Sequence, residues 1–548
     1  MGIYLNPGNE GFREALNTSI YVDKTDMVAC LNSFVDTKKK YVCVSRPRRF
    51  GKTMATDVLC AYYGCGAGSR SLFEPLKLAK CKDWDRYLEK FNVVRLTMTG
   101  FLKPGLSFQE NLQRMQKHLM RDFNQHWHDL DFLEPDNAIL AMQEIYESTK
   151  TKFVVIIDEW DAIFREYKND YNAQKLYLDF LRDWFKDQKC VALVYMTGIL
   201  PIKKYGKHSA LNMFDEYSML APMEMASFTG FTSDEVQELC VRFGMDYGKI
   251  EEWYDGYIVE GTSRADGEFQ NSPDVNKVRP PAKTYHLYSP LSVVKAMDTG
   301  SIRNYWNNTE TYEALAEYIR MDFDGLKETI ARLMAGAKLP VNLGTYQNDM
   351  SSMSCRDDIL ALLIHLGYLG YEQETGCVFI PNREILEVYD VSTQKPEWNA
   401  TMRALKNSQE LLEATWAFNE KRVAELLEAA HDKSGNRTYN SEAALSYAVQ
   451  LAYYKAQDEY TIIPELDTGK GYADLVFIPR NARRPALLVE LKYQEDADSA
   501  IEQILRRDYP SRLEQYRGNL ILVGVNYVKS QNPNAPDFKH HSCRLIKA

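Results

Sequence analysis

The chain has 548 residues, of which 45% are hydrophobic and 26% charged, and its formal net charge is −10. This length exceeds what one hydrophobic core organises, so we expect roughly two to four domains. The acidic balance excludes a protein that coats nucleic acid through bulk charge. No apolar run reaches membrane-span length, and the first residues lack the basic and apolar regions of a signal peptide. The ten cysteines include no CxxC pair. We therefore expect reduced thiols, no membrane partner and a cytoplasmic location.

The first part of the chain alternates β-type runs with helical ones. The β-type runs are YVCVS, FNVVRLTM, FVVIID and CVALVYMTG. Such alternation predicts a parallel sheet covered by helices, and we assign residues 1–230 to an α/β core.

After this core the sequence becomes mainly helical. A helix start with capping-box spacing at Thr232 and Glu235 opens residues 231–335, which we predict to be a helical lid with a surface insertion near 259–284. Residues 336–395 fit a helix followed by a hairpin, in a winged-helix module or another small packed module. The remaining segments are predicted to be a helical connector at 396–440 and an α/β domain at 441–548.

A basic loop lies between the run YVCVS and the helical stretch KTMATDVLCAYY. It ends in Gly-Lys-Thr, which fits a phosphate-binding loop: backbone N–H groups, a lysine for the β- and γ-phosphates, and a hydroxyl for Mg²⁺ at a helix start. The first glycine of such loops is replaced here by an arginine, so a basic strand-to-helix turn is the alternative. The candidate nucleotide-binding residues of the loop are Arg46, Pro47, Arg48, Arg49, Phe50, Gly51, Lys52 and Thr53.

Two later β-type runs end in polar residues that support a nucleotide site. Asp158 and Glu159 follow the run FVVII, at the strand end where ligands bind in open α/β sheets. An acid there can share Mg²⁺ with the loop threonine, and the next carboxylate can orient the attacking water. Thr197 ends a third run, where it can contact the γ-phosphate or simply be a strand-end threonine.

Taken together, the motifs resemble the predicted AAA-ATPase-like family, whose members often carry a C-terminal PD-(D/E)xK nuclease-like domain. In that family an arginine–proline opening of the loop is normal. The resemblance implies ATP as ligand, Lys52 on its phosphates, Thr53 and Asp158 on Mg²⁺, and Glu159 as catalytic base. The motifs that carry it are YVDKT, RPRRFGKT, VVIIDEWD, MTGIL, FTGFTSDEV, WYDGY and LYSPLSV.

A second set of acids lies near the C-terminus, in ADLVFIPRNARRPALLVELKY. Glu490 and Lys492 are two apart and share one face of a strand, and a hairpin turn would bring Asp474 near that face. Metal-dependent cleavage of phosphodiesters uses such carboxylates and a cation. Glu442 is a further candidate metal ligand, although a residue just after Ser441 also fits the start of a helix. Glu490 and Lys492 fit an ordinary charged pair as well.

The order helix, strand with Asp474, strand with Glu490 and Lys492, helix, strand resembles the PD-(D/E)xK fold. Gln503 then stands on the following helix at a position that is often polar in such domains. Many relatives have an arginine two residues before the aspartate, whereas residues 471–474 read GYAD. This departure leaves the predicted metal-binding residues in place and puts the substrate contact of that arginine in question.

The sequence therefore predicts an α/β protein with a P-loop NTPase parallel sheet, a helical lid, a helix–hairpin module and a PD-(D/E)xK nuclease-like domain. We expect a Mg²⁺-dependent ATPase coupled to a nuclease-like domain that acts on DNA or RNA with Mg²⁺ or Mn²⁺, and oligomerisation is compatible with it. The alternatives are a nucleotide-switched binding protein whose nuclease fold is inactive, and a DNA-processing motor, for which the sequence offers no basic groove.

Overall fold

In this computed structural model the chain forms two units, the first made of Met1–Thr309 and Pro340–Ile385 and the second of Glu310–Leu339 and Leu386–Ala548. We describe each by itself. The described residues are 2–103, 105–202, 211–262, 282–306, 315, 325–334, 336–344, 346, 353, 355–393, 399–431, 445–446, 449–450, 452–453, 456, 459–467, 472–481, 483–507, 513–514, 516, 518–529 and 539–548.

A five-stranded parallel sheet organises the first unit, in the order β2-β3-β4-β1-β5. Strands β1, β3 and β4 are buried along their whole length, as expected for a parallel sheet covered on both faces. This confirms the predicted α/β core. The strands are β1 (Tyr41–Ser45), β2 (Asn92–Thr97), β3 (Phe153–Asp158), β4 (Val191–Gly198) and β5 (Asp215–Tyr217).

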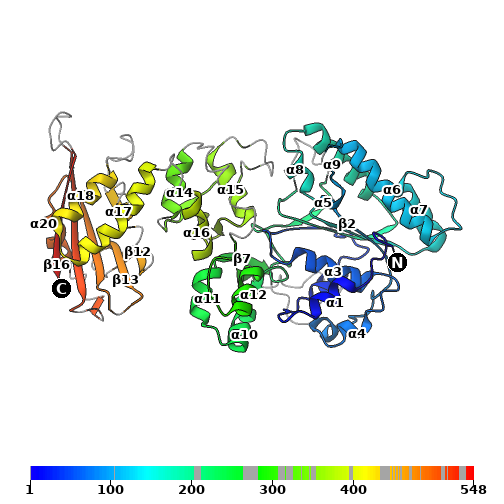
Figure 1. The fold of residues 1–548 in the computed structure, drawn as a ribbon, viewed down its shortest axis with the longest axis horizontal. Helices are drawn as coiled ribbons and strands as arrows, with labels where there is room; N and C mark the ends of the chain where they lie inside the picture. The colour runs from blue at the N-terminus through cyan, green and yellow to red at the C-terminus, as the bar shows by residue number, and fades with distance from the viewer. Residues whose placement is uncertain are drawn as a thin grey trace, which may run out of the picture. The chain divides into compact units, whose positions relative to one another are not determined.

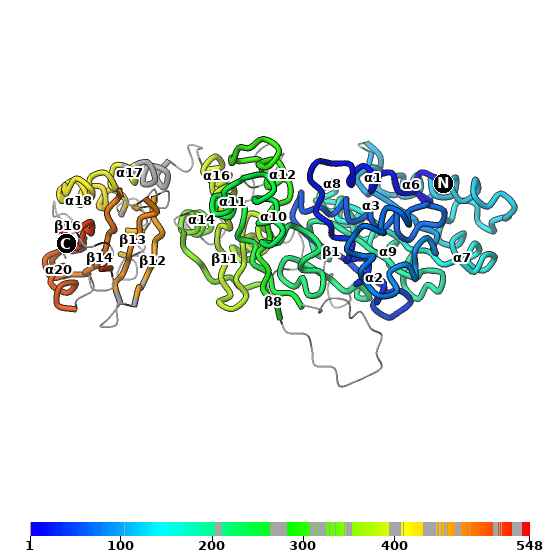
Figure 2. The backbone as a smooth tube through the Cα atoms, turned by 90° about the horizontal axis from the view of Figure 1, so that it is seen from below, coloured from blue at the N-terminus to red at the C-terminus, as the bar shows by residue number. Residues whose placement is uncertain are grey.

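Helices cover both faces of this sheet (Figure 1). On one face α1 (Glu10–Leu16), α2 (Met27–Asn32) and α3 (Lys52–Tyr63) pack on β1 and β4 in one hydrophobic cluster. The chain path of this region runs in blue and cyan in Figure 2. The other helical segments are α4 (Arg70–Phe73), η1 (Lys77–Lys80), α5 (Met98–Phe101), α6 (Phe108–His126), α7 (Ala138–Thr149), α8 (Ala162–Glu166) and α9 (Tyr171–Phe185).

The lid region contains a small antiparallel sheet as well as helices. β6 (Phe231–Thr232), β8 (Ala282–Tyr288) and β7 (Tyr257–Thr262) pair in the order β6-β8-β7. The sequence predicted helices with a surface insertion near 259–284 here, and the strands β7 and β8 lie at the two ends of that segment. The capping box at Thr232 is confirmed. The lid helices are α10 (Ser233–Phe243), α11 (Tyr247–Tyr254) and α12 (Pro290–Thr299).

The predicted helix–hairpin module is present in the first unit. Helix α15 (Arg356–Leu366) ends at Gly367, and the antiparallel hairpin of β10 (Gly370–Glu372) and β11 (Cys377–Phe379) follows. Helix α16 (Arg383–Ser392) comes next, and the short strand β9 (Leu339–Pro340) precedes the module in sequence. We call residues 356–379 the helix–hairpin module.

The second unit is built on a mixed five-stranded sheet, β12-β13-β14-β15-β16, in which β14 and β15 are parallel. Side chains of β14 alternate between a cluster on the α17–α18 side and a cluster on the α20 side. The sequence predicted the three inner strands and missed β12 and β16. The elements are α14 (Leu326–Met334), α17 (Asn399–Trp416), α18 (Glu420–His431), β12 (Tyr460–Asp467), β13 (Tyr472–Pro479), β14 (Ala486–Tyr493), α20 (Ala497–Arg506), β15 (Leu520–Lys529) and β16 (Lys539–Lys547).

Two general expectations can be compared with the structure. Among the described helices, none combines the length and the apolar character that crossing a bilayer requires. All ten cysteines are present as thiols. Six of these thiols are buried, and burial raises the pKa of Cys60 to about 12, so this thiol stays protonated near neutral pH.

Candidate functional site

The predicted nucleotide-binding residues meet at one edge of the parallel sheet. Ser45, the last residue of β1, pairs with Gly198 of β4, and Asp158, the last residue of β3, pairs with Thr197 of β4. Because parallel strands end at the same edge, the phosphate-binding loop after β1 opens beside Asp158 and Thr197. The sequence prediction had placed these residues on separate runs, and the register brings them together.

The loop itself turns sharply into helix α3, which begins at Lys52. Gly51 has a φ of 83°, in the left-handed region that favours glycine, and no atom lies within 4 Å of where its Cβ would be. The conformation, and not crowding, therefore requires glycine there. No side chain caps the first turn of α3, so its backbone N–H groups carry the positive end of the helix dipole toward the loop.

Lys52 is buried against the loop that it follows. Its Nζ donates to the carbonyl oxygens of Arg46 at 3.0 Å and Pro47 at 2.7 Å. Burial lowers the pKa of this amine to about 8, and nearby carboxylates, that of Asp161 first, oppose the shift. The Lys52 ammonium is therefore buried with carbonyl oxygens as its hydrogen-bond partners, and a bound phosphate would add negative charge beside it.

Thr53 and Asp158 already contact each other. The Thr53 hydroxyl donates to the Asp158 carboxylate at 2.8 Å, and the backbone N–H of Glu159 donates to the other oxygen at 3.0 Å. Burial raises the pKa of Asp158 although Thr53 and Lys52 oppose the shift. The Thr197 hydroxyl, at the same sheet edge, is buried and has no hydrogen-bond partner among the residues that the structure describes.

Glu159 is held in a strained position next to an arginine. Its φ is 52°, uncommon for a residue with a side chain and often found at functional sites. The Arg165 guanidinium on α8 contacts the Glu159 carboxylate at 3.4 Å and the fully buried Asp161 carboxylate at 3.7 Å. Asp161 also accepts the backbone N–H groups after β4, from Ile199 and Leu200.

The sequence reasoning did not identify Asp161 and Arg165. The signal was present in DEWDAIFRE, where an acid and an arginine are four residues apart and fall on one face of a helical turn. The sequence did not indicate that the segment after β4 lies beside Asp161. In the structure the backbone N–H groups of Ile199 and Leu200 donate to the Asp161 carboxylate at 3.2 and 3.1 Å.

The arginines of the loop have different environments. Arg46 is fully buried, and its guanidinium donates to the carbonyl oxygens of Ser45, Tyr217 and Met225. Burial lowers its pKa to about 10, so it stays charged near neutral pH. Arg48 is half-buried and Arg49 is exposed. Arg46 thus anchors the loop to β5, and Arg48 and Arg49 are the arginines with access to a ligand.

These residues fit a nucleoside triphosphate with Mg²⁺. Phosphates require N–H groups at a helix start and a lysine, both of which the loop and α3 supply. Mg²⁺ requires oxygen ligands and usually takes one or two carboxylates together with phosphate oxygens. Thr53 and Asp158 supply a hydroxyl and a carboxylate side by side.

The second set of predicted residues lies in the other unit, on β13, β14 and α20. On β14, Leu487, Val489 and Leu491 join the cluster on the α17–α18 side, so Glu490 and Lys492 face α20. Asp474 accepts the backbone N–H of Leu491 at 2.7 Å, which brings this aspartate beside Glu490. The predicted hairpin arrangement of the two strands is confirmed.

Gln503 of α20 connects the two charged residues of β14. Its amide N–H donates to the buried Glu490 carboxylate, and its carbonyl oxygen accepts from Lys492 at 2.8 Å. Lys492 itself lies 3.9 Å from Glu490. Helix α20 packs closely here, because a Cβ on Gly524, which pairs with Glu490, would lie 2.5 Å from the carbonyl oxygen of Ala497.

The structure describes two of the three acids predicted to bind a metal in the C-terminal segment. Glu442 lies outside the described residues. In the described part of the chain, no three His, Cys, Asp or Glu side chains gather in a way that could hold a metal ion. Asp474 and Glu490 offer two carboxylates, so a metal at this site would need substrate or water oxygens to complete its ligands.

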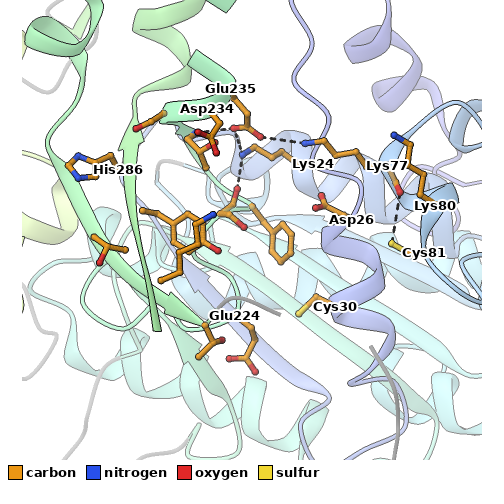
Figure 3. A pocket seen from close by; sticks show the side chains of 18 residues that line it. Lys24, Asp26, Cys30, Lys77, Lys80, Cys81, Glu224, Asp234, Glu235 and His286 are labelled. Carbon is orange, nitrogen blue, oxygen red and sulfur yellow. Dashed lines mark hydrogen bonds and ion pairs between the residues drawn. The ribbon is translucent and has the colours of Figure 1, made fainter. Parts of the chain in front are cut away.

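The first unit also contains a hollow of about 730 Å³ that none of the loop residues lines (Figure 3). Lys24 donates to Glu235 at 2.5 Å and to the carbonyl oxygen of Ser227 at 2.6 Å, and Lys77 lies 3.7 Å from the same glutamate. Asp26 lies beside these two lysines. The charges therefore balance one another and connect the start of α10 to the segment before α2 and to η1.

A loop between β1 and α3 at the edge of a parallel sheet, with a threonine that contacts an aspartate and a lysine bound to the loop, fits an α/β protein with a P-loop-type nucleotide site. Comparison with known families agrees. Residues 8–206 match the model described as predicted AAA-ATPase, and residues 445–533 match the PD-(D/E)XK nuclease superfamily. The two matches confirm the resemblance seen in the sequence, to the predicted AAA-ATPase family in the N-terminal segment and to the PD-(D/E)XK nuclease superfamily in the C-terminal segment.

Two individual proteins are also similar. An uncharacterised protein in the vnfD 5′ region of Azotobacter chroococcum mcd 1 is 22% identical over 308 residues, or 55% of this chain and 52% of that protein. The match therefore spans about half of the relative's length. The structure of the Aeropyrum pernix ORC2 protein in ADPNP–ADP complexes covers 68% of this chain and 93% of its own, at 13% identity and a TM-score of 0.21.

Proposed function

We propose that this chain binds ATP with Mg²⁺ at the loop of residues 46–53 and hydrolyses it. The match of residues 8–206 to the predicted AAA-ATPase model supports a nucleotide-hydrolysing enzyme. The observation that carries the assignment to these residues is the contact of Thr53 with Asp158 beside the buried, carbonyl-bound Lys52. ATP is the expected nucleotide, and Mg²⁺ neutralises its phosphates when bound.

In this proposal each residue has a separate task. Lys52 exchanges its carbonyl partners for phosphate oxygens, and Thr53 and Asp158 hold the metal ion. Glu159 accepts the proton of the attacking water while Arg165 keeps its carboxylate oriented. Thr197 donates its hydroxyl, which has no partner in the protein, to the γ-phosphate.

Steady-state ATP hydrolysis tests the assignment. Lys52→Ala should abolish it, and Lys39→Ala should not, because Lys39 is an exposed lysine that precedes β1 and lies outside the loop. Undiminished hydrolysis by Lys52→Ala would show that the site has been assigned to the wrong residues.

We further propose that the C-terminal unit cleaves DNA or RNA phosphodiesters with Mg²⁺ or Mn²⁺, bound by Asp474 and Glu490, and that Lys492 stabilises the developing charge. The support is the shared face of these residues and the nuclease superfamily match. Incubation of single- and double-stranded DNA and RNA with either metal tests it. Glu490→Ala should lose cleavage and Glu495→Ala, at an exposed position of the same segment, should keep it.

Two observations favour a second candidate, a nucleotide-switched binding protein whose nuclease fold no longer cuts. Gln503 is hydrogen-bonded to both the Glu490 carboxylate and the Lys492 ammonium. In addition, the arginine that is common two residues before the aspartate is absent before Asp474. Absence of cleavage by the wild type with every substrate and metal, together with intact ATP hydrolysis, would support the switch. Cleavage that Glu490→Ala removes would exclude it.

A further inference from the structure

The two apolar residues of the phosphate-binding loop, Pro47 and Phe50, are both buried under segments outside the parallel sheet. The Phe50 ring meets the Tyr257 ring edge-on, with centroids 5.3 Å apart. Pro47 lies against Gly367, where a Cβ would come within 2.8 Å of the Pro47 ring. Tyr257 begins β7 of the lid, and Gly367 ends α15 of the helix–hairpin module. The outer side of the loop is therefore covered by the lid and by this module.

The two covering residues are also bound to each other. The Tyr257 hydroxyl donates to the carbonyl oxygen of Gly367 at 2.7 Å. A Cβ on Gly370 would lie 2.8 Å from the carbonyl oxygen of Gly256, so the backbones of the hairpin and of the chain entering β7 are in close contact. We call Tyr257 and Gly367 the clasp, because their hydrogen bond joins the two segments that cover the loop.

Gly367 meets two separate requirements. Its φ of 87° favours glycine, and the space for a side chain is filled by Pro47 and Trp306. Gly376, in the turn of the same hairpin, has a φ of 66° and nothing within 4 Å of its Cβ position. The two glycines thus share the backbone requirement, and only Gly367 also leaves room for the loop.

This contact gives a reason for the unusual start of the loop. The Arg46 guanidinium is hydrogen-bonded to the carbonyl oxygen of Tyr217 in β5. The next residue, Pro47, supplies a ring that packs on Gly367, and a glycine in place of Pro47 would supply no such ring. Phe50 is further fixed because its carbonyl oxygen accepts the N–H of Gly230 at 3.0 Å. The inner side of the loop, with Lys52, is left for phosphate.

We propose that the clasp of Tyr257 and Gly367 positions the phosphate-binding loop and couples nucleotide occupancy to the helix–hairpin module. This inference rests on the proposed ATP site. Coupling of binding equilibria is reciprocal, so a clasp that supports the loop improves ATP affinity, and bound ATP stabilises the module to the same extent.

The positioning role is tested without nucleotide, by amide hydrogen exchange of the peptide that covers residues 46–53. Gly367→Ala and Tyr257→Phe should accelerate its exchange about three- to tenfold, the effect of losing one hydrogen bond or contact. Gly376→Ala is the matched control, because it adds a methyl group at a positive φ with no neighbour. Tyr257→Phe removes a single hydroxyl, so it decides the question even if Gly367→Ala folds poorly. Unchanged loop exchange in Tyr257→Phe, or equal acceleration in Gly376→Ala, overturns the proposal.

The coupling is tested by titration with ATP. Gly367→Ala and Tyr257→Phe should bind ATP about three- to tenfold more weakly than Gly376→Ala, and saturating ATP should slow exchange in residues 356–379 of the wild type. Equal affinities in the three variants would overturn the coupling and leave the ATP site intact. Absence of ATP binding by the wild type would overturn the proposed function and the coupling with it, while loop exchange without nucleotide would still decide whether the clasp positions the loop.

Discussion

The two candidate sites differ in what holds their charged groups. At the sheet edge of the first unit, within the described part of the chain, the hydrogen bonds of Lys52 go to carbonyl oxygens and the buried Thr197 hydroxyl has no partner. These groups are therefore oriented and still able to bind a ligand. In the second unit, Gln503 contacts both Glu490 and Lys492, so the charged groups of this site are held by another side chain of the protein. Residues of the expected types on one face therefore do not by themselves make a site ready for a ligand.

The largest effect that we expect is at the first site and concerns Glu159. Glu159→Gln keeps the size of the side chain and removes the base, so we expect ATP hydrolysis to fall about 10²- to 10⁴-fold, as for loss of a general base, while ATP still binds. Single-turnover hydrolysis and equilibrium ATP binding measure the two effects. Glu166→Gln, at an exposed position of α8, the helix that follows Glu159, is the control. Hydrolysis at the wild-type rate in Glu159→Gln would assign the base elsewhere.

The next effect tests whether the nuclease-like site is closed by its own side chains. Gln503→Leu removes an amide donor to the buried Glu490 carboxylate, which should cost about 1–3 kcal/mol in the free energy of opening of β14. Native-state hydrogen exchange of the β14 amides measures it, and Glu502→Ala, exposed and adjacent, should leave it unchanged. If β14 is protected equally in Gln503→Leu, the contrast between the two sites fails.

Much of the first site could be predicted because it is local in sequence. Strand, loop, Gly-Lys-Thr and helix follow one another within about 25 residues, and β3 and β4 end in recognisable polar residues. The carboxylate pair of the second unit was predictable for the same reason, since period-two spacing places Glu490 and Lys492 on one face.

The remaining features depend on distant parts of the chain. Arg46 was predicted as a nucleotide contact, and its guanidinium instead meets carbonyl oxygens of residues 217 and 225, which no local pattern places beside it. The contact of Pro47 with Gly367 joins positions 320 apart in sequence, and β12 and β16 are defined by pairing partners more than by their own composition. Long-range register is what the sequence did not contain in readable form.

A smaller effect concerns the charge of Lys52. Its pKa is lowered to about 8 by burial, so the free protein loses this charge as the pH rises through 8. ATP affinity should then fall by up to about tenfold per pH unit above 8, and Lys52→Arg, which stays charged, should show a flat profile however weakly it binds. Titrations between about pH 7 and pH 9.5 measure this.

Loss of folding does not explain such a fall. Because the folded-state pKa of Lys52 lies below its unfolded value, the burial of this group costs stability below pH 8, and that cost fades as the pH rises toward about 10.4. If the ATP affinity of the wild type does not change between these pH values, the Lys52 ammonium keeps its charge above pH 8. The buried, carbonyl-bound position of Lys52 would then not make ATP binding depend on pH.

The smallest effect concerns the Thr197 hydroxyl, which is the clearest sign of unused binding capacity at the first site. Thr197→Val keeps the shape of the side chain and removes a buried group without a partner, so the fold should lose nothing measurable and could gain slightly. If the hydroxyl meets the γ-phosphate, the variant should bind ATP about three- to tenfold more weakly and bind ADP unchanged. Tyr177→Phe removes another buried hydroxyl without a partner, on α9, and should leave both affinities equal to the wild type. Equal weakening for ATP and ADP would place the hydroxyl elsewhere on the nucleotide, and no weakening would mean that it is simply tolerated, as the Tyr177 hydroxyl is.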